Sequence, residues 1–296
     1  MFFPTPKEHG RRLAWVTGAG GLIGNYLANT PRGDDWQVRA LTRPQLDLSD
    51  SVSVERAFRS DSPDLVLHCA AVSKVIACAA DPPLAWRINV EVTRHLAELA
   101  ESIPFVFIST DLVFDGRLGN YDESASPNPL SDYGETKAAA EAIVLNNPRH
   151  TVIRTSLNCG TSPTGNRAFN EEMALAWKAG RTLRLFTDEF RSPIPAEITA
   201  RAIWEFARNG QVGLFHVAGA DRLSRWDAGR IIAHLNPELN PRLIADTVRN
   251  FTGPPRPRDT SLDCRKAAKA LSFRLPGLRE ALEGNRPFHE PVQPVP

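Results

Sequence analysis

The sequence predicts a doubly wound α/β fold, in which helices cover both faces of a parallel β-sheet. Apolar stretches typical of strands alternate with helix-like segments through the first 156 residues. The strands are continuous apolar runs, as expected for a parallel sheet buried on both faces. A glycine-rich turn joins the first strand to the first helix. The expected strands are 13–16, 36–43, 63–71, 103–110 and 149–156, and later helices are expected at 49–60, 82–102 and 133–146.

The alternation becomes less regular after residue 156. Helices are expected at 169–180, 192–210 and 224–235, strands at 182–186 and 213–219, and a proline-rich loop leads into a helix within 253–271. Ser224 is a candidate N-cap of the third helix. We therefore expect one domain at 1–156 and a smaller α/β lobe, mainly at 157–296. Some later segments are expected to return to the first domain, and a proline-rich tail occupies 286–296.

Composition argues against several classes of protein. Hydrophobic residues at 42%, charged residues at 23% and a net charge of +1 describe an ordinary globular protein with no global attraction for nucleic acid or anionic membranes. No apolar run approaches the length of a membrane span, and the first residues lack the apolar core of a signal peptide. The four cysteines fit neither a disulfide framework nor a zinc site, and no acidic cluster has metal-ligand spacing. We expect a cytoplasmic protein with reduced thiols and no metal.

The glycine turn carries the first functional signal. Gly18, Gly21 and Gly24, with Leu22 and Ile23 between the last two, stand where the first strand meets the first helix. Glycine permits a tight turn there and lets the backbone approach a pyrophosphate at the helix N-terminus. This position predicts a dinucleotide-binding (Rossmann) domain at 1–156 and makes the five residues candidate cofactor contacts.

The end of the second strand distinguishes between the two nicotinamide cofactors. An acidic residue there suits the ribose hydroxyl of NAD, whereas arginine suits the 2′-phosphate of NADP. This chain has Arg39 and Arg43 and no acid before Asp47. Arg43 favours NADP(H), NAD(H) stays open, and a solvated surface arginine is the alternative. Asp47 can instead hydrogen-bond the adenine amino group, and Leu48 beside it is also a candidate cofactor contact.

Tyr133 and Lys137 form a Tyr-x-x-x-Lys pattern within the helix expected at 133–146. Residues four apart lie on one face of a helix, so the two side chains can act together. The pattern alone is weak evidence, because a chain with three tyrosines and six lysines matches it by chance in about 6% of cases.

Several motifs in order are more specific. The glycine turn, "HCAA" after a strand, "STDLVFDG" and the Tyr–Lys pair together resemble the extended short-chain dehydrogenases/reductases. "STDLVFDG", "DEFRSPI" and "RPRDTSLDC" are similar to the dTDP-4-dehydrorhamnose reductase-like branch. The resemblance runs from about Arg11 to about residue 282.

The resemblance implies a catalytic group. Tyr133 would be the general acid that protonates a carbonyl oxygen as its carbon is reduced. Lys137 would hold the nicotinamide ribose and pull the pKa of Tyr133 down from about 10. Thr110 would hydrogen-bond the substrate carbonyl, with Ser109 as the alternative.

Further residues are implied with less specific roles. Cys69, Ala70 and Ala71 would pass beside the cofactor, whereas His68 is expected to be a packing or hydrogen-bonding residue. Asp111 would tune the acid or cap a turn, and it is also a candidate substrate contact. The other candidate substrate contacts are Ser156, which ends the strand at 149–156, and Arg191 and Arg256, which lie in loops. Each loop arginine, Arg258 included, can equally be a surface charge.

Three functions are compatible with these residues. The first is NADP(H)-dependent reduction of a keto nucleotide sugar, in a protein whose oligomeric state stays open, with a homodimer as the candidate. The second is an epimerase or dehydratase that retains NAD. The third is a non-catalytic regulatory subunit like the beta subunit of methionine adenosyltransferase, which belongs to the same branch. Leu157 departs from the aromatic residue usual in the rhamnose-forming reductases, so the sugar stays open.

Overall fold

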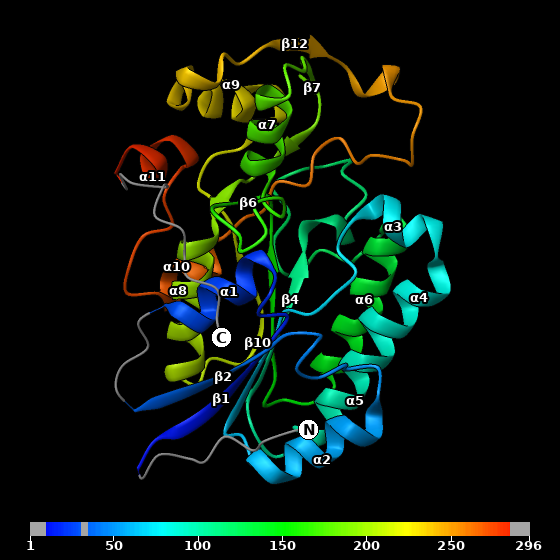
Figure 1. The fold of residues 1–296 in the computed structure, drawn as a ribbon, viewed down its shortest axis with the longest axis vertical. Helices are drawn as coiled ribbons and strands as arrows, with labels where there is room; N and C mark the ends of the chain where they lie inside the picture. Colours follow the sequence, from blue (N-terminus) through cyan, green and yellow to red (C-terminus); the bar gives the residue numbers. More distant parts are fainter. Residues whose placement is uncertain (1–9, 31–34, 285–296) are drawn as a thin grey trace.

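The chain forms three layers, with a parallel sheet between two layers of helices (Figure 1). The computed structural model describes residues 10–30 and 35–284, so the tail expected at 286–296 lies outside the described residues. All strand pairs in the central sheet are parallel. In spatial order the strands are β10 (Gly213–Val217), β5 (Thr151–Thr155), β4 (Phe105–Thr110), β3 (Leu65–His68), β1 (Arg12–Thr17) and β2 (Trp36–Leu41).

Both faces of this sheet are buried, which confirms the predicted fold class. In β1, Ala14 and Val16 pack on one face and Leu13 and Trp15 on the other. The first face is covered by α1 (Leu22–Asn29), α8 (Ala196–Arg208) and α10 (Arg265–Ala270). The second is covered by α2 (Ser51–Asp61), α5 (Val92–Leu99) and α6 (Asp132–Leu145). Continuous apolar strands were the right signal because each side chain, on either face, meets a helix.

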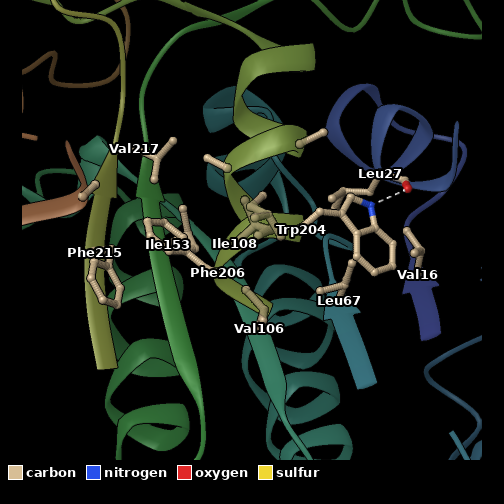
Figure 2. Close-up of a cluster of buried hydrophobic side chains, with 14 of the residues drawn as sticks. Val16, Leu27, Leu67, Val106, Ile108, Ile153, Trp204, Phe206, Phe215 and Val217 are labelled. Carbon is tan, nitrogen blue, oxygen red and sulfur yellow. Dashed lines mark hydrogen bonds between the residues drawn. The ribbon is translucent and has the colours of Figure 1, made fainter. Parts of the chain in front are cut away.

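Trp204 of α8 is the largest fully buried side chain on the first face (Figure 2). It is 1% exposed, and its Nε1 donates to the Leu27 carbonyl of α1 at 2.9 Å. Its ring centroid lies 5.9 Å from that of Trp36 in β2. A segment that follows residue 156 therefore fixes the helix that begins at the glycine turn.

A smaller lobe lies beyond the carboxyl ends of the strands (Figure 1). Its core is an apolar cluster built from both of its longer helices, α7 and α9. Its elements are β6 (Asn158–Cys159), α7 (Phe169–Lys178), β7 (Leu183–Phe186), β8 (Phe190–Arg191), β9 (Ile194–Pro195), β11 (Leu223–Ser224), α9 (Arg225–Leu235), β12 (Leu243–Asp246) and α11 (Leu278–Gly284). The domain boundary at 156/157 stays a prediction, while β10 shows that the central sheet includes residues after it.

Two expected helices have different bounds in the structure. The segment 82–102 consists of α4 (Pro82–Trp86), a π-helical turn (Arg87–Glu91) and α5, preceded by an unexpected α3 (Val75–Ala80). The helix expected at 192–210 begins at Ala196, because Ile194 and Pro195 pair with β6 instead. Short 3-10 helices occupy 111–113, 237–239 and 248–250. None of the helices within 10–30 and 35–284 is both long and apolar enough to cross a membrane.

The loop after β4 and the segment near residue 260 are packed together. A Cβ on Gly116 would lie 2.6 Å from Pro257 Cβ, so only glycine fits there. Asp259 N donates to the Gly116 carbonyl at 3.0 Å, and Tyr121 bridges to Leu262. The segments that carry the motifs "STDLVFDG" and "RPRDTSLDC" therefore pack directly against each other.

Replacing Trp204 by alanine tests the packing of α8. We expect the free energy of unfolding to fall by about 3–5 kcal/mol, because the change opens a large cavity and leaves a polar contact unmade. Trp86→Ala, at a residue 46% exposed, is the control and should change it by about 1 kcal/mol or less. Urea unfolding measures both. Equal effects would show that Trp204 does not anchor α1.

Candidate functional site

The carboxyl ends of β1, β3, β4 and β5 meet at one edge of the sheet, at Thr17, His68, Thr110 and Thr155. The glycine turn follows β1 at this edge. Gly18 has φ of 66°, and a Cβ on it would lie 2.7 Å from the backbone nitrogen of Ala70. A Cβ on Gly24 would lie 2.3 Å from the Gly18 carbonyl oxygen. Only glycine permits α1 to begin this close to the end of β3.

The N-terminus of α1 suits an anion. Gly21 occupies the N-cap, no side chain caps the helix, and no acid lies in its first turn, which begins at Leu22. Asp50 and Ser131, by contrast, cap α2 and α6. Backbone N–H groups at the start of α1 are thus left for a ligand, which fits the pyrophosphate of a dinucleotide. Ile23, in the same turn, packs against the core.

At the end of β2 the two arginines have different environments. Arg39 is held against Asp61, with Nε 3.1 Å from Oδ2. The Arg43 side chain is 82% exposed, and its Nε lies 3.7 Å from Asp47 Oδ2. Asp47 accepts from the backbone and hydroxyl of Ser49, which hold the pKa of its carboxyl below the ordinary value. Leu48 packs against the core. At the end of β2, Arg43 is therefore the residue whose side chain extends outward from the protein.

A buried hydrogen-bond chain fixes the end of β3. Thr17 Oγ1 lies 2.7 Å from His68 Nδ1 and accepts from the backbone nitrogens of Cys69 and Ala70. Burial lowers the pKa of His68 to about 3, so the ring is neutral. His68 is thus a hydrogen-bonding residue, as expected. These hydrogen bonds hold Cys69, Ala70 and the following Ala71 beside the glycine turn. All three residues are partly exposed.

The structure brings Thr110, Tyr133 and Lys137 together. Ser131 accepts from Gly134 N and starts α6, which carries Tyr133 and Lys137 one turn apart. Thr110 lies close enough to the Tyr133 hydroxyl to lower the pKa of the phenol, while its own Oγ1 donates to Asp111 Oδ1 at 3.2 Å. Lys137 is buried, with Nζ 3.8 Å from the centroid of the Phe107 ring in β4. Ser109 Oγ is buried without a hydrogen-bond partner among the described residues.

The pKa of Tyr133 shifts in the direction opposite to the expectation. Burial raises it, the Asp111 carboxylate raises it further, and the Thr110 hydrogen bond only partly offsets them. Both main causes disfavour the phenolate. Burial lowers the pKa of Lys137 to about 7, against the opposing effect of Glu141. Tyr133 therefore carries its proton at neutral pH, the state that an acid needs.

Asn89 belongs to this site and was not predicted from the sequence. It lies in the π-helical turn, where its Nδ2 donates to Thr136 Oγ1 at 3.0 Å and its Oδ1 accepts from Val72 N at 2.8 Å. It thus ties the loop after β3 to the helix that carries Tyr133. The only indication in the sequence was a single asparagine within a long segment expected to be helical. The structure adds the π-helical turn, a feature that often lies at functional sites.

A protein-family model described as RmlD substrate binding domain matches residues 13–285. The chain belongs to this family. Among relatives, the dTDP-4-dehydrorhamnose reductase of Sinorhizobium fredii is 29% identical, over 91% of this chain and 95% of that protein. The methionine adenosyltransferase 2 subunit beta of Xenopus laevis is 28% identical, over 92% of this chain and 87% of that protein. Sequence similarity alone thus reaches both a reductase and a protein named as a subunit of an adenosyltransferase.

The fold agrees with the family. A crystal structure of dTDP-4-dehydrorhamnose reductase from Bacillus anthracis, in complex with NADP, superposes with a TM-score of 0.86 at 23% identity. It covers 93% of this chain and 98% of that one. The likeness extends over both the sheet and the smaller lobe.

In this RmlD-family protein Asp111 gathers side chains from three other segments of the chain. Its Oδ2 accepts from Ser156 Oγ at 2.6 Å, Thr260 Oγ1 at 2.9 Å and Arg191 Nη1 at 3.1 Å. Arg191 Nη2 also donates to Glu189 at 3.2 Å. The predicted residues Asp111, Ser156 and Arg191 are therefore in direct contact, with Asp111 beside Thr110.

The remaining arginines occupy different places. Arg256 donates to Glu189 through Nε at 2.6 Å and Nη2 at 3.0 Å, so it joins the group around Arg191. Arg258 is exposed. Arg154 is buried away from this group, with Nη2 2.7 Å from Glu141 Oε2. Among residues 10–30 and 35–284, no cluster of three or more histidine, cysteine or acidic side chains could hold a metal ion.

The pH dependence of stability tests the burial of Lys137. Below pH 7 the lysine is protonated in both states, and the folded state bears the cost of burying the charge. Between about pH 7 and its unfolded pKa of 10.5, the unfolded chain binds a proton that the folded chain has released, so stability rises with pH. From pH 7 to pH 9 the native protein should gain about 2 kcal/mol relative to Lys137→Met.

Urea unfolding without cofactor at the two pH values measures this gain. Lys178→Met, at the exposed end of α7, is the matched control and should keep the native pH slope. A Lys137→Met slope equal to that of the native protein would contradict the assignment.

Proposed function

We propose that the chain is an NADP(H)-dependent reductase of a keto sugar carried on a nucleotide. The observation that carries the proposal is the meeting of Thr110, Tyr133 and Lys137 at the sheet edge where α1 begins uncapped. The dinucleotide, when bound, supplies a hydride to a carbonyl carbon. The names of the reductase relative and of the NADP-bound structure support the substrate class and the cofactor.

The three residues would act on the carbonyl oxygen. Tyr133, protonated at neutral pH, donates its phenolic proton to that oxygen, which becomes the hydroxyl of the product alcohol. Thr110 donates a hydrogen bond to the same oxygen and stabilises its developing charge. Lys137 hydrogen-bonds the nicotinamide ribose and, when charged, stabilises the phenolate that remains until solvent reprotonates it.

The other predicted contacts divide between the two ligands. Gly18, Gly21, Leu22, Ile23 and Gly24 would receive the pyrophosphate. The adenosine half would lie against Arg43, Asp47 and Leu48, and the nicotinamide half would pass Cys69, Ala70 and Ala71. Asp111, Ser156, Arg191 and Arg256 would line the substrate side, where Asp111 and Arg191 act mainly by holding one another in place.

Tyr133→Phe tests the acid. Removing the hydroxyl should lower kcat by about 10²- to 10⁴-fold and leave the Kd for NADPH unchanged, because the ring keeps its packing. The measurement is NADPH absorbance at 340 nm with a panel of 4-keto nucleotide sugars. An active Tyr133→Phe enzyme would refute the role of Tyr133.

The same assay separates the competing functions. Sugar turnover without net NADPH oxidation would favour an epimerase or dehydratase that retains NAD. Binding of NADPH with no turnover on any sugar, together with tight binding of a partner protein, would favour a regulatory subunit. The second outcome has a specific basis in the similarity to methionine adenosyltransferase 2 subunit beta.

Arg43→Gln tests the cofactor preference. If the guanidinium pairs with the 2′-phosphate, the Kd for NADPH should rise about tenfold or more and the Kd for NADH should stay unchanged. Arg59→Gln is the control, because Arg59 is also exposed but lies on α2. Equal weakening of both cofactors, or of neither, would remove Arg43 from the cofactor site.

A further inference from the structure

Arg225, the first residue of α9, stands next to the arginine group of the substrate side. Ser224 caps this helix by accepting from Asp227 N at 3.0 Å, as expected from the sequence. Leu223 and Ser224 pair with Arg191 and Phe190 in an antiparallel ladder. Arg225 N then donates to the Glu189 carbonyl at 2.9 Å. The backbone therefore fixes Arg225 opposite Glu189, and its guanidinium lies 5.7 Å from the centroid of the Phe169 ring in α7.

The neighbouring carboxylate is already occupied. Glu189 accepts from Arg191 at 3.2 Å and from Arg256 at 2.6 and 3.0 Å. Within residues 10–30 and 35–284 the guanidinium of Arg225 makes no ion pair or hydrogen bond with any side chain. Three guanidinium groups thus share two buried carboxylates, Glu189 and Asp111, and one positive charge is left over.

The pKa shifts distinguish Arg191, whose charge is compensated by carboxylates, from Arg225, whose charge is not. Burial acts to lower the pKa of Arg191, but Asp111 and Glu189 outweigh it and raise the pKa. Burial lowers the pKa of Arg225, and Arg191 and Arg256 lower it further, while Glu189 only partly opposes them. Glu172 of α7 also faces Arg225, but it is paired with Lys74 at 3.3 Å. A partly buried cation with uncompensated charge is unfavourable unless an anion binds.

We propose that Arg225 binds the diphosphate of the nucleotide-linked substrate. The proposal rests on the function proposed above and adds the residue that recognises the phosphate groups. A diphosphate supplies the missing negative charge and several acceptors for the planar guanidinium. The position is consistent with one substrate spanning the site, because Arg191 links Glu189, beside Arg225, to Asp111, beside Thr110. The sugar would lie toward Tyr133 and the diphosphate toward α9.

Arg225→Met tests the proposal in the full chain. The probes are thymidine diphosphate and thymidine, each titrated with and without NADPH. Loss of the charged contact should raise the Kd for thymidine diphosphate about 10- to 100-fold. Thymidine, which has no phosphate, should bind the variant and the native protein alike, and Arg225→Lys should fall between the two. Arg230→Met is the matched control, because Arg230 lies exposed on the same helix.

The melting temperature of each variant without ligand shows whether α9 is intact. If Arg225→Met melts early, Arg225→Lys is used instead, with the same probes and a smaller expected loss. An unchanged Kd for thymidine diphosphate in the folded variant would overturn the proposal even if the protein reduces keto sugars. Arg225-dependent binding of thymidine diphosphate, with no NADPH oxidation on any member of the keto-sugar panel, would support it and refute the reductase function instead.

Discussion

The buried carboxylate of Asp111 is the constraint on which the substrate side of the site depends. It sits directly after Thr110 at the end of β4, and its Oδ2 receives Ser156 from the end of β5, Arg191 from the small lobe and Thr260 from the segment after residue 253. Three separate stretches of chain therefore converge on one oxygen. Removing Arg191 would leave the Asp111 charge buried without compensation, which is costly in a protein interior. The surroundings of Thr110 are thus set partly by residues far away in the sequence.

The glycine turn, on the proposed cofactor side, is held in place by the close approach of one backbone segment to another. Gly18 and Gly24 allow α1 to begin against the end of β3, and Thr17 gathers the following backbone N–H groups with its hydroxyl. Little there depends on charge. Trp204 presses α1 onto the sheet from α8, so the small-residue turn is supported by a large buried ring. One half of the site is therefore organised by packing and the other by ion pairs.

This division explains what the sequence could and could not predict. Continuous apolar runs and glycines at a strand end have a local physical cause, so the parallel sheet, the glycine turn and the cap at Ser224 could be predicted from the sequence alone. Asn89 was missed because its partners lie 17 and 47 residues away. The pKa of Tyr133 was expected to move the wrong way, because spacing along a helix reveals Lys137 but neither burial nor the Asp111 carboxylate. Arg225 could not be distinguished from a surface arginine until β8 and β11 were seen to pair.

The contact of Gly116 with Pro257 has a consequence for biosynthesis. The loop that follows β4 is held by residues synthesised some 140 positions later, as the hydrogen bond from Asn120 to Ser261 illustrates. Thr260 also completes the shell of Asp111. A chain still emerging from the ribosome can assemble most of its sheet, yet the proposed substrate side stays incomplete until residues 257–262 have left the exit tunnel. The shell around Asp111 therefore forms late in synthesis and not gradually along the chain.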